Sequence, residues 1–177
     1  MAALTGFMIQ NCKLVPALAP QTMGGAADGD WVSMKGYDRL GILVYVTQGN
    51  ASSSALTVDI ADDVAGTTVT AGITMNDWWY ITDTAIGTDA GTNSDTWAKG
   101  AAGVTIATSA TGTGASAYYI EIDADDVSTG SAFAAKTPCA QLKVGISNVG
   151  NILSAFYILH PSRYAQAASP TPSAIID

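Results

Sequence analysis

The stretch from Trp31 to Gly49, which reads WVSMKGYDRLGILVYVTQG, constrains the fold more than any other part of this chain. Residues 42–47 within it, ILVYVT, alternate with a period of two and are rich in β-branched and aromatic side chains, a pattern typical of a β-strand and not of a helix. Both phases of the alternation are apolar, which predicts a strand that is covered on both faces and lies centrally in its sheet. We therefore expect the other strands to be arranged around this one.

Further runs with strand character follow at roughly even spacing along the chain. They are residues 31–35, 55–61, 78–82, 104–108, 118–123, 141–147 and 152–159. With an edge strand near the N-terminus they give about nine short strands and almost no helix. This pattern predicts an all-β fold, an antiparallel β-sandwich or jelly-roll-like single domain.

Three finer predictions concern pairing and side-chain orientation. Residues 55–61 are expected to form an antiparallel hairpin with the central strand, joined by a longer loop, with Asp59 on the solvated face. Ile146 is expected to be buried with its strand. Because adjacent residues of a strand point to opposite faces, one of Trp78 and Trp79 should enter the core, while the other faces a loop, a neighbour or a ligand.

The 177 residues suggest about one domain, with distinct segments at its two ends. Pro16 and Pro20 disfavour a central strand or a long helix, so residues 1–20 are interpreted as an N-terminal arm or an edge strand. The β-sandwich domain is expected to span residues 21–164. Residues 165–177, rich in alanine and proline, are expected to form an extended C-terminal tail.

The composition limits the kinds of partner. Charged residues make up only 12% of the chain, about half the usual share, which fits a protein that hides much of its surface against neighbours. A monomer with a neutral Ser/Thr surface is the alternative. The net charge of −8 and the lack of a basic cluster argue against nucleic acid as a partner. No apolar run is long enough for a membrane span and no leader peptide is recognisable, so we expect a soluble protein with no membrane partner.

The residues that usually carry metal or catalytic chemistry are few. One histidine and two cysteines, Cys12 and Cys139, cannot make a standard zinc site, and free thiols are favoured over a disulfide. The carboxylates at 59–63 and 123–126 could hold Ca²⁺ but are better explained as turn and capping residues. His160 could serve Ser154 or Ser162, yet neither serine lies in a nucleophile motif. We therefore expect no catalytic residues, no metal and no cofactor.

The tryptophans leave a second kind of function open. Trp78, Trp79 and Trp97, with the tyrosines, could form a platform on which a sugar stacks, as in a carbohydrate-binding β-sandwich module. Core packing explains most of these aromatic residues without a ligand.

Three blocks of the chain resemble small structural proteins of tailed bacteriophages. The blocks are WVSMKGYDRLGILVYVTQG at 31–49, YYIEIDADDV at 118–127 and LKVGISNVGNILSAFYILHPSRY at 142–164. The resemblance implies a virion component: a capsid decoration (cement) protein on the outer surface of the head, or alternatively a head–tail or tail accessory protein. It further implies the major capsid protein and other copies of the chain, often in β-rich trimers, as partners. It supplies no catalytic residues.

A structural role of this kind requires surfaces for protein contact. Exposed aromatic side chains suit symmetric apolar patches, and arginine suits bidentate pairing with carboxylates across an interface. The candidate interface residues are Arg39, Tyr45, Trp79, Trp97, Phe156 and Arg163.

Overall fold

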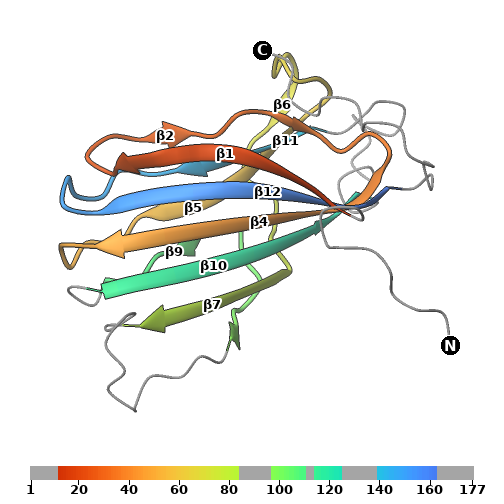
Figure 1. The fold of residues 1–177 in the computed structure, drawn as a ribbon. Helices are drawn as coiled ribbons and strands as arrows, with labels where there is room; N and C mark the ends of the chain where they lie inside the picture. The colour runs from red at the N-terminus through yellow and green to blue at the C-terminus, as the bar shows by residue number, and fades with distance from the viewer. Residues whose placement is uncertain (1–11, 84–96, 111–113, 125–138, 163–177) are drawn as a thin grey trace, which may run out of the picture.

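Two antiparallel β-sheets pack face to face in the computed structural model, which describes residues 12–83, 97–110, 114–124 and 139–162 (Figure 1). The predicted all-β sandwich is confirmed. The first sheet has the strand order β1 (Lys13–Thr22), β12 (Ile152–Ser162), β4 (Tyr37–Gln48), β10 (Gly114–Asp123), β7 (Asp77–Asp83) and β8 (Ala98–Lys99). The second has the order β2 (Ala27–Asp28), β11 (Cys139–Val144), β5 (Ala55–Ala61) and β6 (Val69–Thr70). Two short strands pair off this path, β3 (Val32–Ser33) with β11 and β9 (Ile106–Ala107) with β5.

Strand β4 occupies the centre of the first sheet, between β12 and β10, as its sequence predicts. Its inward side chains are fully buried: Leu40, Ile42, Val44 and Val46. Its outward side chains are not, because the second sheet can cover only one face of the first. Leu43 is half-buried and Tyr45 is 41% exposed, so the prediction that both faces are covered is wrong for the single chain.

Strand β5 has the predicted bounds but a different partner. It lies in the second sheet beside β11, and the chain crosses between the sheets after β4 instead of turning back in a hairpin. Alternation identifies a strand but does not identify its neighbour, so the hairpin prediction is wrong. Asp59 is buried at 5% exposure because it has partners: its carboxylate accepts the Gly72 N–H at 2.8 Å and lies 3.6 Å from Lys143 Nζ.

Strand β10 orients its side chains as predicted, with Tyr118, Ile120 and Ile122 buried. Strand β11 ends at Val144, two residues before Ile146, which is 66% exposed. The expected burial of Ile146 is therefore wrong, because the residue lies beyond the part of the segment that pairs with β5.

The segments at the ends of the chain are only partly within the described residues. Residues 13–22 form β1, an edge strand of the first sheet that carries Pro16 and Pro20. Residues 1–11 and the predicted tail at 165–177 lie outside the described residues. Neither cysteine forms a disulfide, and Cys139 is buried beside Ser33. Burial raises the pKa of Cys139 to about 11.

Asn151 ties together two loops at one end of the sandwich. Its amide oxygen accepts the Gly49 and Asn50 N–H groups at 3.0 and 2.9 Å, and its amide nitrogen donates to the Ser52 carbonyl and the Ser147 hydroxyl at 2.9 and 3.0 Å. The side chain is only 1% exposed. It therefore satisfies polar groups of the loop that crosses between the sheets, where water has little access.

Replacing Asn151 should weaken the fold sharply. We expect Asn151→Ala to lower the free energy of unfolding by about 2–4 kcal/mol, because several buried polar groups lose their partners. Asn50→Ala, an exposed asparagine in the same network, is the control and should change stability by less than about 0.5 kcal/mol. Urea denaturation measures both, and equal effects would contradict the assignment.

A second buried polar contact joins the two sheets directly. The Tyr157 hydroxyl on β12 accepts the Leu142 N–H of β11 at 2.8 Å and donates to the Asp30 carbonyl at 3.0 Å. Burial raises the pKa of this hydroxyl well above its usual value. The folded protein therefore retains this proton at pH values where an unfolded tyrosine has lost it.

The Tyr157→Phe variant tests this contact. Near neutral pH it should lower the free energy of unfolding by about 1–3 kcal/mol, since the Leu142 N–H loses its acceptor. Because the folded-state pKa is raised, the stability that the hydroxyl contributes is complete below about pH 10 and is lost as the pH rises further. The difference between wild type and variant should shrink above pH 10 in denaturation curves, whereas Tyr45→Phe, on the exposed face, should show no such change.

Candidate functional site

The outer face of the first sheet carries a continuous apolar row across five strands. We call Pro16, Phe156, Leu43, Tyr119 and Trp79 the aromatic row. Their strands place them in register, each residue beside the next, and Lys99 on β8 follows Trp79 at the end of the row. Each belongs to the outward phase of its strand, opposite the phase that is buried between the sheets. The pairing of distant segments thus assembles one surface.

The side chains at one end of the row are held by their neighbours. The Trp79 and Tyr119 rings lie 6.1 Å apart at an angle of 36°, and Lys99 Nζ lies 5.6 Å from the Trp79 ring centre. The same ammonium lies 2.6 Å from the Asp77 carboxylate. Partial burial, with the negative charge of Glu121 nearby, raises the pKa of Tyr119. Trp79 therefore has a cation over one ring face and does not present that face to a ligand.

Gly41 makes room for the ring of Tyr119. A Cβ atom at Gly41 would lie 2.5 Å from the Tyr119 hydroxyl oxygen and 2.8 Å from the ring. The hydroxyl end of the Tyr119 ring thus lies over the backbone of β4 at Gly41, and its Cα lies beside Leu43 in the row. Close contact between a ring and a strand glycine protects the backbone that glycine leaves uncovered.

Beyond the aromatic row, toward the end of β4, most outward positions of the outer face are uncharged. They are Ile152, Ser154, Tyr45, Thr47, Ala115, Ala117 and Ile81. The strand register adds one acidic residue, Asp83, beside Ala115 at the end of β7. Several apolar members are substantially exposed, and interfaces are depleted of charge at their core and enriched in aromatic residues. This part of the face has the composition of a protein-contact surface.

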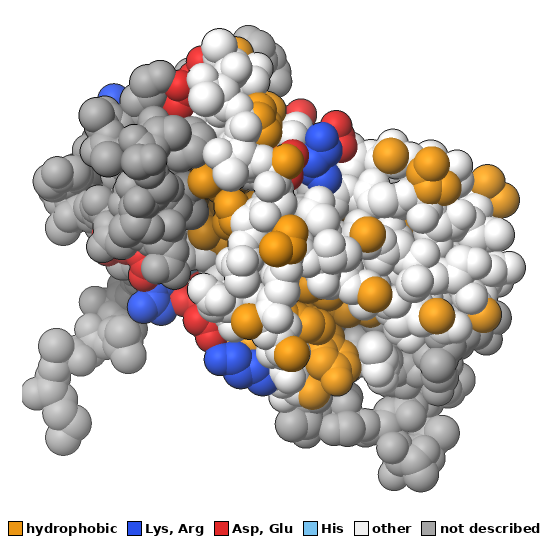
Figure 2. Space-filling view, turned by 180° about the vertical axis from the view of Figure 1, so that it is seen from behind, with side chains coloured by type: hydrophobic (Ala, Val, Ile, Leu, Met, Phe, Trp, Pro, Cys, Tyr) orange, Lys and Arg blue, Asp and Glu red, His pale blue; other side chains and the backbone are white. Residues whose placement is uncertain are grey.

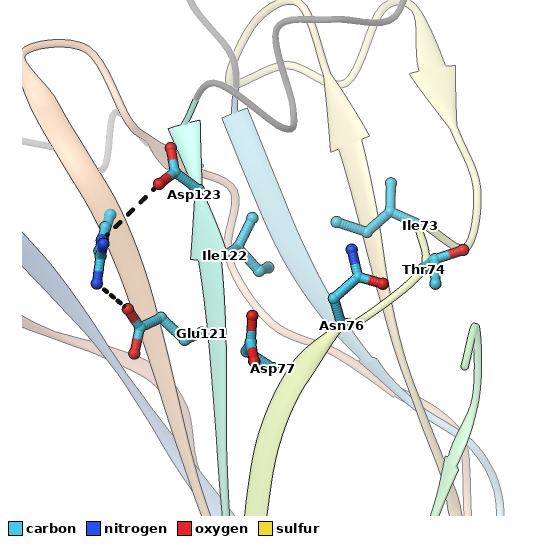
Figure 3. Close-up of a pocket in the computed structure, with 8 residues that line it drawn as sticks. Ile73, Thr74, Asn76, Asp77, Glu121, Ile122 and Asp123 are labelled. Atoms are coloured by element: carbon cyan, nitrogen blue, oxygen red, sulfur yellow. Dashed lines mark hydrogen bonds and ion pairs between the residues drawn. The ribbon is translucent and has the colours of Figure 1, made fainter. Parts of the chain in front are cut away.

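Charge is gathered at the opposite end of the face. Arg39 on β4 contacts the Glu121 carboxylate at 2.6 Å and the Asp123 carboxylate at 3.8 Å, both on β10 (Figure 3). A hollow of about 400 Å³ opens beside them, lined also by Asn76 and Asp77. In the described part of the chain, no group of His, Cys, Asp and Glu is placed to hold a metal ion. The arrangement is an ion-pair cluster in which one guanidinium lies between two carboxylates.

The serine–histidine pairing considered from the sequence is not assembled with Ser154. His160 and Ser154 lie on the same strand, six residues apart, which places them about 20 Å from each other. The side chain of Ser162 lies outside the described residues. His160 instead lies beside Arg39 in the register of β12 and β4.

The structure brings together four of the six candidate interface residues. Tyr45, Trp79 and Phe156 share the outer face of the first sheet, and Arg39 lies at its charged end, where it pairs with carboxylates of its own chain. Trp97 is exposed just before the edge strand β8, and Arg163 lies outside the described residues. Leu43, Tyr119 and Pro16 were not among the candidates. The outward phase of their strands was the available signal, but only the strand register shows that they adjoin.

Trp78 and Trp79 point to opposite faces, so they do not form one sugar platform. Trp78 is partly buried against the core, and its indole N–H donates to the Ala101 carbonyl at 2.8 Å. Gly100 lies against this ring so closely that a Cβ atom there would come within 2.0 Å of it. The expectation that one of the two tryptophans enters the core is confirmed.

The outer face of the second sheet has a different character. Seen from behind, the molecule shows scattered hydrophobic side chains among polar groups and backbone, one larger hydrophobic cluster in the lower centre of the view, and a few small groups of charges (Figure 2). The ion pair between Lys143 and Asp28, at 3.4 Å, belongs to this sheet. The first sheet differs in that it carries the row of aligned apolar residues, with its charges gathered at one end of the face.

Comparisons with known proteins leave the family open. No protein-family model matches the chain, and no curated protein does. A solved structure titled "Structure of infectious bursal disease virus Gx strain" is similar over 84% of this chain and 39% of that chain, with 12% sequence identity and a TM-score of 0.23. Similarity at that level carries no argument about function. Within the described residues, no helix has the length and hydropathy of a membrane span.

A double-mutant cycle tests how the face is built. Gly41→Ala should lower the free energy of unfolding by about 1–3 kcal/mol, because the new methyl group displaces the Tyr119 ring. In a Tyr119→Ala background the same change should be neutral or slightly stabilising, since alanine restricts the unfolded chain more than glycine does. Denaturation of the four proteins gives the coupling energy, and additive effects would contradict the packing of Tyr119 on Gly41.

Proposed function

We propose that this protein is a structural component of a tailed-phage virion, a capsid decoration protein that binds the outer surface of the head and stabilises contacts between major capsid subunits. The observation that carries the proposal is the outer face of the first sheet. There the aromatic row crosses five strands and adjoins an area whose outward positions are uncharged except for Asp83 at the end of β7. A protein that acts by contact needs such a face, and the phage resemblance of the three sequence blocks supplies the setting.

The chemistry of the face favours protein over the other partner classes. Tryptophan, tyrosine and arginine dominate the binding energy of protein interfaces, and Trp79, Tyr119, Tyr45 and Arg39 all lie on this face. The net charge of −8 is unfavourable for contact with DNA phosphates and is compatible with the outside of a DNA-filled shell.

The carbohydrate alternative finds less support in this geometry. A sugar stacks on a ring whose flat face is open, but Lys99 covers one face of Trp79. Trp78, on the other side of the sheet, is covered by Gly100. A protein surface, which fits between tilted side chains, suits this row better.

Binding to phage heads is the direct test. Wild-type protein should co-sediment saturably with heads assembled from the major capsid protein of the same source, and cryo-electron microscopy should show added density on the outer surface. Heads already saturated with unlabelled protein are the control and should bind no more of a labelled sample. Density at the neck or tail would favour the accessory-protein alternative, and no binding to any particle would overturn the proposal.

A further inference from the structure

We propose that the outer face of the first sheet is covered by the same face of a second copy of this chain. The twofold axis lies between the two faces, parallel to β4, at the point where the two Leu43 side chains meet. The inference deepens the proposed function, since it rests on the claim that this face is a protein contact and names the partner. In this dimer the face is buried between the two copies, so the dimer meets the head through its other surfaces.

The aromatic row matches itself when it is reversed. It reads Pro16, Phe156, Leu43, Tyr119, Trp79 across the sheet, with Leu43 in the middle. Rotation about β4 places Leu43 against Leu43, Phe156 against Tyr119, and Pro16 against Trp79. These are an aliphatic pair on the axis, two aromatic pairs beside it, and two proline–indole contacts outside. A twofold interface requires this kind of self-complementarity, in which each pair occurs twice.

At the charged end of the face, the same rotation places Glu121 opposite Ile158 and Asp77 opposite Leu14 of the second copy. Both acids keep their partners within their own chain, Arg39 for Glu121 and Lys99 for Asp77. His160, Arg39 and Asp123 adjoin one another on β12, β4 and β10, so the rotation places each His160 opposite Asp123 of the second copy. Arg39 lies on the axis, where two guanidinium groups would repel if they were unpaired. Each is paired within its own chain, at 2.6 Å from Glu121. The rotation therefore leaves no unpaired cation facing another.

The size of the face is that of a stable interface. Five strands at about 4.8 Å spacing make it roughly 24 Å wide, and about eight residues at 3.3 Å make it roughly 27 Å long. The flat area is then on the order of 650 Å² per copy, and the relief of the side chains adds to it. A standard interface buries about 800 Å² per partner, and stacked sheets meet at a spacing of about 10 Å.

The edges of the first sheet are poorly suited to the other common mode of strand association. The edge strand β1 carries Pro16 and Pro20, which lack the N–H groups that a pairing strand needs. The opposite edge, β8, has only two residues. Short and proline-bearing edges prevent the addition of further strands, so association through the face is favoured over association through the edge.

The oligomeric state of the full chain tests the inference. Light scattering after size-exclusion chromatography should give a mass of about 36 kDa, twice the 18.0 kDa of one chain. Leu43→Lys, which places two like charges on the axis, should raise the dimer dissociation constant by about 30-fold or more. Ile146→Lys, at an exposed site outside the face, is the matched control and should leave it unchanged. Circular dichroism and thermal unfolding establish that each variant is folded.

Charge complementation tests the register of the contact. Phe156→Lys and Tyr119→Glu should each weaken the homodimer, while a mixture of the two variants should form heterodimers that hold a lysine–glutamate pair and an unchanged Phe156–Tyr119 pair. Failure of the mixture to associate, when both variants are folded and monomeric, would overturn the twofold register.

Three other outcomes separate this inference from the proposed function. A monomer at high micromolar concentration, or a trimer as the phage resemblance implies, would overturn the twofold contact. If such a protein still binds heads, the proposed function stands without it. The remaining outcome is a wild-type protein that forms a dimer, loses it in Leu43→Lys, and binds no phage particle. That result would support the twofold contact and overturn the decoration role.

Discussion

The packing of β4 against the second sheet is the interaction on which the rest of this structure depends. Four of its inward side chains are fully buried, and burial of each such side chain contributes about 1.5–3 kcal/mol. Because successive side chains of a strand point to opposite faces, the burial of Ile42 and Val44 requires Leu43 and Tyr45 to point outward. The strand sequence is apolar in both phases, so the fold cannot hide one set of side chains without displaying the other.

Local alternation in the sequence predicted strands well and strand partners poorly. The bounds of β5 and the orientation of Tyr118 follow from residues that are close in the chain. The partner of β5 does not follow from them, because the choice between β4 and β11 depends on which strands the whole fold places in each of the two sheets. Asp59 shows the same limit: its burial requires the N–H of Gly72 and the ammonium of Lys143, which no period within β5 reveals.

Some residues of the candidate surface could be predicted from the sequence, but which of them lie beside one another could not. Tyr45, Trp79 and Phe156 could be chosen as exposed aromatic residues on strands, whereas their grouping with Leu43 and Tyr119 depends on the register of three strand pairs. Arg39 could be chosen as a partner for carboxylates. That those carboxylates are Glu121 and Asp123 of the same chain follows only from the pairing of β4 with β10.

The buried thiol of Cys139 gives the folded chain an unequal pair of cysteines. Thiol reagents and oxidants attack the thiolate, and a pKa of about 11 keeps that species scarce at neutral pH, even apart from the shielding of the sulfur. Burial raises the pKa of Cys12 as well, but this residue is only half-buried, so its sulfur is less shielded than that of Cys139. The rate at which labelling rises from one toward two thiols per chain would therefore report the rate at which β11 opens. This strand pairs with β2, β3 and β5 and so holds the second sheet together.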